Sequence, residues 1–192
     1  LLVNAQLFDS YEDSLQDCQL VIGTSARHRN IEWPVCTPRE CAQKALAMPG
    51  KVAILFGREH SGLTNQELDH CHLVVHIPTN PTFSSLNIAA AVQILAYELR
   101  LKGDELSIET TDNWLPVTPL HPSEEIATAE TMVHFYQHLE QTMIELEFLD
   151  PQKPKHLMRR LKRLFNRAQP INSEINILRG ILSAVQAQRR KK

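Results

Sequence analysis

The sequence predicts an α/β fold with a mostly parallel sheet, followed by a C-terminal helical extension. Short apolar runs in the first 80 residues alternate with segments of helical pattern, which is typical of parallel strands with helices on the faces of the sheet. Polar loops follow the runs. A basic segment with helical periodicity then fills the last 40 residues.

The first part of the chain supplies the sheet. Its expected strands are residues 3–8, 20–22, 51–56 and 73–77, and the expected helices between them are 11–17, 39–47 and 62–70. Pro34 and Pro38 bracket a connection that we expect to be irregular.

A long helix is predicted from Ser84 to about Lys102, with Ser84 or Ser85 as its cap. It is apolar nearly all round, so it needs cover on both sides, either from this chain or from a second subunit. Residues 103–122 hold three prolines and show no periodicity, which indicates a linker. Further helices are predicted from Ser123, over 155–168 and over 173–188.

The expected organisation is therefore a sheet domain over 1–102, a linker over 103–122 and a basic helical extension over 123–192. The apolar content of 43% in 192 residues suffices for one sizeable core with an appendage. The sequence has neither a run of about 18 apolar residues nor a secretion-signal pattern at its start. We therefore expect a cytoplasmic protein with no membrane partner.

The four cysteines predict neither disulfides nor a zinc site. Cys18, Cys36, Cys41 and Cys71 lie in or beside apolar runs of a long chain, which favours reduced thiols. Two histidine groups are weak candidates for metal ligands. Alternation along the strand separates Cys71 from His72 and His76, and no glutamate motif surrounds His134 and His138, so we expect no metal.

Charge is divided unequally along the chain. Residues 153–192 hold 12 Lys and Arg against one acidic residue, a net charge of +11, whereas the first 152 residues have a net charge of −13. Such asymmetry favours a polyanionic partner, and the helix over 155–168 would contact a nucleic-acid backbone. The alternative is an ordinary solvated helix face.

Polar loops at the ends of predicted strands indicate a small-molecule site. One loop follows Ile22 and holds Thr24, Ser25 and Ala26, and a second begins at Gly57. Ligands of open α/β sheets bind at the carboxyl ends of the strands. The glycine spacing fits neither a phosphate loop nor a dinucleotide fingerprint, and no G-x-S-x-G elbow is present.

Two long motifs give the chain a resemblance to a known family. VAILFGREHSGLTNQEL resembles the second motif of the SpoU branch of the SPOUT RNA methyltransferases, and HIPTNPTFSSLNIAAAVQILAYEL resembles the third. The segments QLVIGTSARHR, FYQHLEQ and MRRLKRLFNRA are similar to the bacterial tRNA cytidine/uridine 2′-O-methyltransferases that act at nucleotide 32 of the anticodon loop. This resemblance implies a trefoil-knotted α/β domain, a homodimer and a tRNA substrate.

The resemblance also implies a pocket for S-adenosyl-L-methionine and roles for individual residues. The implied cofactor-binding positions are Thr24, Ser25, Ala26, Gly57, Ile77, Ser84, Ser85 and Leu86. The polar positions of the two motifs, expected to hold the loops, a substrate phosphate or the ribose, are Arg58, Glu59, Ser85 and Asn87. Glu59 has a structural alternative as an acceptor of backbone N–H groups. The residues expected to contact RNA are Arg27, Arg159, Arg160, Lys162, Arg163 and Arg167.

The family's first motif, Asn-x-Gly-x-x-x-Arg, supplies the arginine usually assigned to activating the ribose hydroxyl, and this chain contains no such segment. We therefore expect the 192-residue chain alone to be catalytically incompetent, and a full-length protein that includes this motif to be competent. Two alternatives to a tRNA enzyme stay open at this stage. One is a non-catalytic RNA-binding homologue, and the other is a ribosomal RNA 2′-O-methyltransferase.

Overall fold

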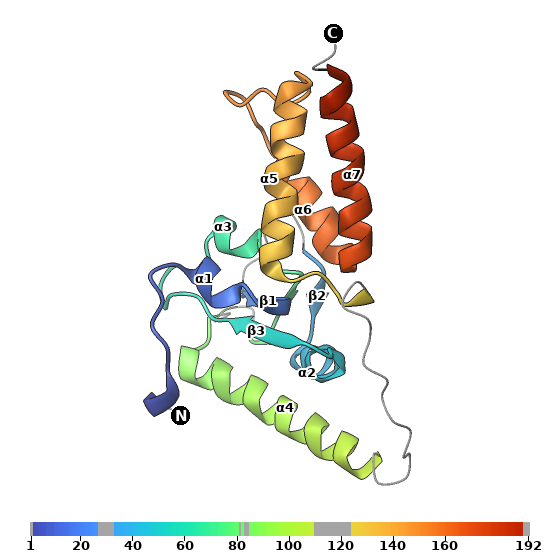
Figure 1. Ribbon diagram of the computed structural model, residues 1–192. Helices are drawn as coiled ribbons and strands as arrows, with labels where there is room; N and C mark the ends of the chain where they lie inside the picture. Colours follow the sequence, from blue (N-terminus) through green and yellow to red (C-terminus); the bar gives the residue numbers. More distant parts are fainter. Residues whose placement is uncertain (1, 27–32, 81, 83–84, 110–123, 190–192) are drawn as a thin grey trace.

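The computed structural model describes residues 2–26, 33–80, 82, 85–109 and 124–189, in which four strands form one sheet and helices lie on both of its faces (Figure 1). The strands are β1 (Cys18–Thr24), β2 (Val35–Cys36), β3 (Lys51–Leu55) and β4 (Leu73–Val75). The helices are the 3-10 helix η1 (Leu2–Asn4), α1 (Tyr11–Leu15), α2 (Pro38–Ala47), α3 (Asn65–Leu68), α4 (Ile88–Glu109), α5 (Ala129–Glu145), α6 (Leu157–Ala168) and α7 (Asn172–Arg189).

All four strands of the sheet are parallel, in the order β2-β4-β1-β3. β1 is central, and its Ile22 pairs with Ile54 of β3 and with Leu73 of β4. A parallel strand covered on both faces has a continuous apolar run, as β1 has. The predicted parallel sheet is confirmed. Because the strands point the same way, the loops after β1, β3 and β4 lie at one edge.

The two faces of the sheet are covered by different helices. On one face Leu15 of α1 and Leu68 of α3 pack around Val21. On the other face Cys41 of α2 and Leu95 of α4 pack around Ile22. All four cysteines are buried and free, which confirms the prediction of reduced thiols.

Residues 124–189 form a C-terminal helical unit of α5, α6 and α7 that stands away from α4, on the other side of the sheet (Figure 1). Its core holds Phe135, which meets the ring of Phe165 edge-on at 4.9 Å between centroids, and Ile175. A short backbone bridge between Ile126 and Ile171 ties its entry to the turn before α7. The unit therefore has its own apolar core.

The C-terminal helical unit docks where the strands begin. The backbone N–H of Glu130 donates to Gln16 just before β1, and the side-chain amide of Asn166 donates to the carbonyls of Asp69 and Cys71 just before β4. The amino ends of parallel strands share one edge. The unit thus contacts the edge opposite to the polar loops.

Two predictions for the strands were wrong. No strand forms over residues 3–8; η1 lies there instead, and Val3 and Leu7 are almost fully exposed. An apolar pattern without a neighbouring strand to pair with cannot form a sheet. The two-residue strand β2, expected as irregular, pairs with β4 at the edge of the sheet. Its shortness left no periodicity to detect.

The ends of two helices also differ from the predictions. α4 begins at Ile88 because Asn87, rather than Ser84 or Ser85, accepts a bond from the N–H of Ala89, and it continues to Glu109 rather than ending near Lys102. Thr128, not Ser123, caps α5. The rest of the predicted linker, residues 110–122, lies outside the described residues. The predicted knot involves the segment before α4, which is described only in part, and it stays a prediction.

Candidate active site

A pocket of about 260 Å³ opens at the carboxyl edge of the sheet, between the loops after β1, β3 and β4 and the start of α4. Seven of the predicted cofactor positions line it together, and these are Thr24, Ser25, Ala26, Gly57, Ile77, Ser85 and Leu86. Ser84 lies outside the described residues. The structure therefore brings together segments that are up to about 60 positions apart in the sequence.

The loop after β1 is fixed by hydrogen bonds to both neighbouring strands. The hydroxyl of Thr24 donates to the carbonyl of Leu55 at 2.9 Å, and the N–H of Ser25 donates to the carbonyl of Val75 at 3.2 Å. The carbonyl of Ser25 also lies 3.2 Å from Nδ1 of His76. Its backbone is thus held in place at the pocket wall without help from a ligand.

The loop after β3 closes on itself. Arg58 and Gly62 exchange two backbone hydrogen bonds, of 3.3 and 2.8 Å, and Gly62 has a positive φ of 66°, which glycine adopts without strain. A Cβ on Gly57 would lie 2.1 Å from the carbonyl carbon of Gly62. The tightness of this loop, rather than the room for a ligand alone, requires glycine at position 57.

Arg58 lines the pocket and forms an ion pair with Glu67. Its Nη1 lies 3.0 Å from Oε1 of Glu67, and its side chain is 63% exposed, against 12% for Glu67. Thr64 donates its N–H to the same carboxylate at 2.6 Å and accepts from the N–H of Glu67, which forms a capping box at the start of α3. Burial acts to raise the pKa of Glu67, but the bonds from Thr64 and Arg58 outweigh it and hold this pKa below its ordinary value.

The other predicted polar residues occupy different places. Glu59 is exposed and lines the pocket, as does Ser85. Asn87 caps α4 and is not among the lining residues. The carboxylate seen to accept backbone N–H bonds beside this loop is that of Glu67, a role considered above for Glu59. The direct roles of Arg58, Glu59, Ser85 and Asn87 in the reaction stay predictions.

Sequence reasoning missed part of the pocket wall. Phe56, Val75, Ile88 and Ala91 also line it. Phe56 directly follows β3 and Val75 is the last residue of β4, so both lie where a strand gives way to a loop. The sequence does not show toward which side of the sheet a side chain at a strand end points, so no sequence signal marks these two residues. Glu67 was also missed, although its spacing from Thr64 is the signature of a capping box.

The histidines considered as metal ligands have other partners. His72 is buried and its Nδ1 accepts the N–H of Val21 at 3.0 Å, while Nε2 of His138 lies 3.1 Å from the side chain of Gln186. Burial lowers the pKa of His72 to about 4. Within the described ranges, no three His, Cys, Asp or Glu side chains gather as a metal site would require. No described helix is long and apolar enough to cross a membrane.

The predicted RNA-contacting residues of α6 fall into two groups. Arg160 and Arg167 are exposed. Arg159 instead bonds Asp69 at 2.8 Å and lies over the ring of Trp33, and Lys162 lies 5.9 Å from the ring centre of Tyr136. Arg163 is half-buried, and Arg27 lies outside the described residues. Only part of the basic sequence of α6 is therefore free to meet a partner.

Comparisons with known proteins agree with this architecture. Residues 1–97 match the SpoU rRNA Methylase family, and residues 130–192 match the family described as tRNA methyltransferase TrmJ, C-terminal domain. The chain is 45% identical over 194 residues to a tRNA (cytidine/uridine/adenosine-2′-O-)-methyltransferase TrmJ of Pseudomonas aeruginosa, covering 97% of this chain and 74% of that protein. It is 48% identical to a tRNA (cytidine/uridine-2′-O-)-methyltransferase TrmJ of Pectobacterium atrosepticum, covering 95% and 74%.

Solved structures show the same relationship. TrmJ from Z. mobilis superposes with a TM-score of 0.78 at 30% identity, covering 96% of this chain and 75% of that one. A probable methylase family protein from Haemophilus influenzae is 41% identical, with a TM-score of 0.51 and coverage of 100% and 76%. A parallel α/β sheet with a pocket at its carboxyl edge and a helical extension is thus the architecture of an RNA methylase. The chain belongs to the SpoU methylase family, and within it to the TrmJ group.

Proposed function

We propose that this chain forms the cofactor pocket and part of the RNA-binding surface of an enzyme that transfers a methyl group from S-adenosyl-L-methionine to a ribose 2′-oxygen of tRNA. The observation that carries the proposal is the convergence of the loops after β1, β3 and β4, with Leu86 before α4, on one pocket. The two relatives described above are named as tRNA 2′-O-methyltransferases, which supports the same substrate class.

The pocket residues fit a nucleoside-type cofactor. Ile77, Leu86 and Phe56 offer apolar surface for a ring system, while the loops at Ser25 and Gly57 offer backbone groups for polar edges. When bound, the cofactor supplies a methyl group activated by its sulfonium. The chain's own contribution is then to hold the reacting groups in line and to orient the ribose.

Arg58 is suited to the substrate side of the pocket. Its guanidinium has five donors, and the ion pair with Glu67 leaves it 63% exposed at the pocket wall. A planar fork of donors matches a phosphate or a ribose oxygen. We therefore assign Arg58 to the tRNA backbone beside the target ribose, while Arg160 and Arg167 of α6 contact phosphates farther away.

The proposed target is nucleotide 32 of the anticodon loop, with cytidine or uridine as base, in the cytoplasm. The test is methyl transfer by the full-length protein to a tRNA anticodon arm and to the same arm carrying a 2′-deoxyribose at position 32. Transfer to the first and loss with the second is the expected result. Transfer that persists with the deoxyribose excludes nucleotide 32.

Two further acceptors separate the other hypotheses. A ribosomal RNA fragment methylated in preference to tRNA would indicate a ribosomal RNA enzyme. Binding of tRNA with no transfer to either RNA, in a sample that binds S-adenosylhomocysteine, would indicate a non-catalytic homologue.

We also propose that the protein is a homodimer that joins through α4. One side of this helix packs on α2 through Leu95 and its neighbours, but Ile88, Val92, Tyr97 and Leu101 stay exposed, between 42% and 56%. A second subunit would cover this apolar surface.

A further inference from the structure

Glu67 stands out as a buried carboxylate aimed at the pocket's arginine. It is 9% exposed as a residue, and its two oxygens receive the N–H of Thr64 at 2.6 Å and Nη1 of Arg58 at 3.0 and 3.2 Å. A capping box at the start of a helix needs only the first of these bonds. The ion pair with Arg58 is therefore additional to what α3 requires.

Arg58 needs such a partner because its side chain is otherwise exposed. An arginine carries considerable rotamer entropy, and holding it in one orientation is costly unless a fixed group meets it. Glu67 is fixed by Thr64 and by burial, so it offers a rigid acceptor. The guanidinium is thus oriented before any substrate arrives, which is the condition for efficient electrostatic assistance.

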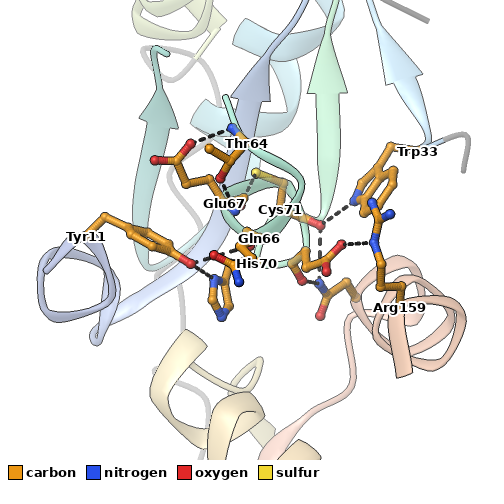
Figure 2. A network of polar contacts seen from close by, with 10 residues as sticks. Tyr11, Trp33, Thr64, Gln66, Glu67, His70, Cys71 and Arg159 are labelled. Atoms are coloured by element: carbon orange, nitrogen blue, oxygen red, sulfur yellow. Dashed lines mark hydrogen bonds and ion pairs between the residues drawn. The ribbon is translucent and has the colours of Figure 1, made fainter. Parts of the chain in front are cut away.

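The far end of α3 is held by the C-terminal helical unit. Arg159 bonds Asp69 at 2.8 Å and lies 5.5 Å from the ring centre of Trp33. Figure 2 shows Arg159 and Trp33 in the same network of polar contacts as Thr64 and Glu67. The buried amide of Asn166 donates to the carbonyls of Asp69 and Cys71 at 3.3 and 3.2 Å.

These contacts immobilise the turn between α3 and β4. Tyr136 donates to Asn166 at 2.6 Å, so α5 also supports the contact. α3 is a single turn, and Asp69 directly follows it, two positions after Glu67. Fixing the end of this helix therefore limits how far Glu67 can move.

We propose that Glu67 is a positioning residue for Arg58 in methyl transfer, and that Arg159 and Asn166 of the C-terminal helical unit support it by fixing the end of α3. This proposal rests on the proposed function, because it assigns Arg58 to the substrate. It gives the extension a second role besides RNA binding: it completes the support of the active-site arginine from the opposite edge of the sheet.

The first test is a double-mutant cycle of Glu67→Gln and Arg58→Ala in the full-length protein, read as kcat and KM for tRNA. Glutamine can keep the capping box, so the fold is preserved while the ionic bond to Arg58 is lost. We expect Glu67→Gln to lower kcat between about tenfold and a hundredfold, with the KM for tRNA and the affinity for S-adenosylhomocysteine nearly unchanged. In the Arg58→Ala background the same substitution should have no further effect.

Two outcomes would overturn this role for Glu67. One is an unchanged kcat, and the other is an equal loss with and without Arg58, which a merely structural residue would give. If the unsubstituted protein neither binds S-adenosylhomocysteine nor methylates tRNA, the proposed function itself fails, and this result is distinct from both.

The second test concerns the support from α6. Arg159→Ala should lower kcat only while Arg58 is present, and Arg159→Lys should restore part of it by keeping a charge beside Asp69. Arg100→Ala is the matched control, because it removes an exposed arginine–carboxylate pair on α4, with Asp104, that touches neither the pocket nor α3. A rise in the KM for tRNA with kcat unchanged would make Arg159 an RNA contact instead and refute its support of α3.

Discussion

At the scale of single residues, three titratable side chains buried in the sheet domain, Glu67, Asp69 and His72, each have a hydrogen-bond partner. His72 is the clearest example. Its Nδ1 accepts the N–H of Val21, so the ring must be neutral there, and burial lowers its pKa from the ordinary 6.5 to about 4. The unfolded chain therefore binds a proton between these pH values that the folded chain does not.

This difference predicts a pH dependence of stability. The contribution of His72 is complete above pH 6.5 and is lost as the pH falls toward 4, by up to about 3 kcal/mol. Urea unfolding across this range should show it, with His72→Gln as the comparison, since glutamine can accept the same N–H without titrating. Parallel curves for the two proteins would contradict the assignment.

Gly57 gives a second prediction at this scale. A Cβ there meets the backbone of Gly62 and Leu63, at 2.1 and 2.2 Å, so Gly57→Ala should distort the loop, lower the unfolding midpoint and weaken S-adenosylhomocysteine binding. Gly180→Ala is the matched control: this residue lies within α7 with open space around it, and alanine should stabilise the helix by roughly 0.5–1 kcal/mol.

At the scale of elements, the basic residues of α6 have two kinds of surroundings: Arg160 and Arg167 are exposed, whereas Arg159 pairs with Asp69. Arg160→Ala and Arg167→Ala should weaken tRNA binding and reduce the dependence of log K on log salt concentration by about one each. Arg100→Ala on α4 should leave both unchanged. Equal salt slopes for all variants would mean that the exposed face of α6 does not contact the tRNA backbone.

The same scale shows what sequence could predict. The strands β1 and β4 were found because burial on both faces leaves an apolar run. β3, which is partly buried at the side of the sheet, was found from its own apolar run. β2 was missed because two residues show no period, and residues 3–8 were predicted as a strand because an apolar pattern does not reveal whether a partner is present. The start of a helix depends on which side chain caps its free N–H groups. Asn87 caps α4 and Thr128 caps α5, although nearby serines were equally plausible caps from the sequence.

The candidate site was more predictable than the contacts that support it. The polar loops could be predicted because they directly follow apolar strands in the sequence. Thr24, Gly57 and Ile77 of these loops line one pocket. Long-range partners leave no local pattern. The bond of Arg159 to Asp69 joins positions 90 apart, and from sequence alone Arg159 is indistinguishable from its exposed neighbour Arg160.

At the scale of the whole molecule, α4 lies on the outside of the sheet domain (Figure 1). Its apolar residues Val92, Tyr97 and Leu101 are exposed. We expect sedimentation equilibrium to give twice the 21.9 kDa of the chain. Tyr97→Glu should shift the protein toward the monomer, because an isolated carboxylate is costly to bury. Gln141→Glu, which adds a carboxylate at an exposed position of α5 away from α4, is the control. A monomeric unsubstituted protein at micromolar concentration would contradict the proposed dimer.

The central claim is that the loops at the carboxyl edge of the sheet form a cofactor pocket, and calorimetric titration with S-adenosylhomocysteine tests it most directly. Ala91 lines the pocket from α4, so Ala91→Trp should fill it and abolish binding. Ala187→Trp, at an exposed position of α7 away from the pocket and from α4, should bind as the unsubstituted protein does. Binding by the unsubstituted protein that is lost only in Ala91→Trp is the predicted result. Absence of binding, or binding that survives Ala91→Trp, would contradict the claim.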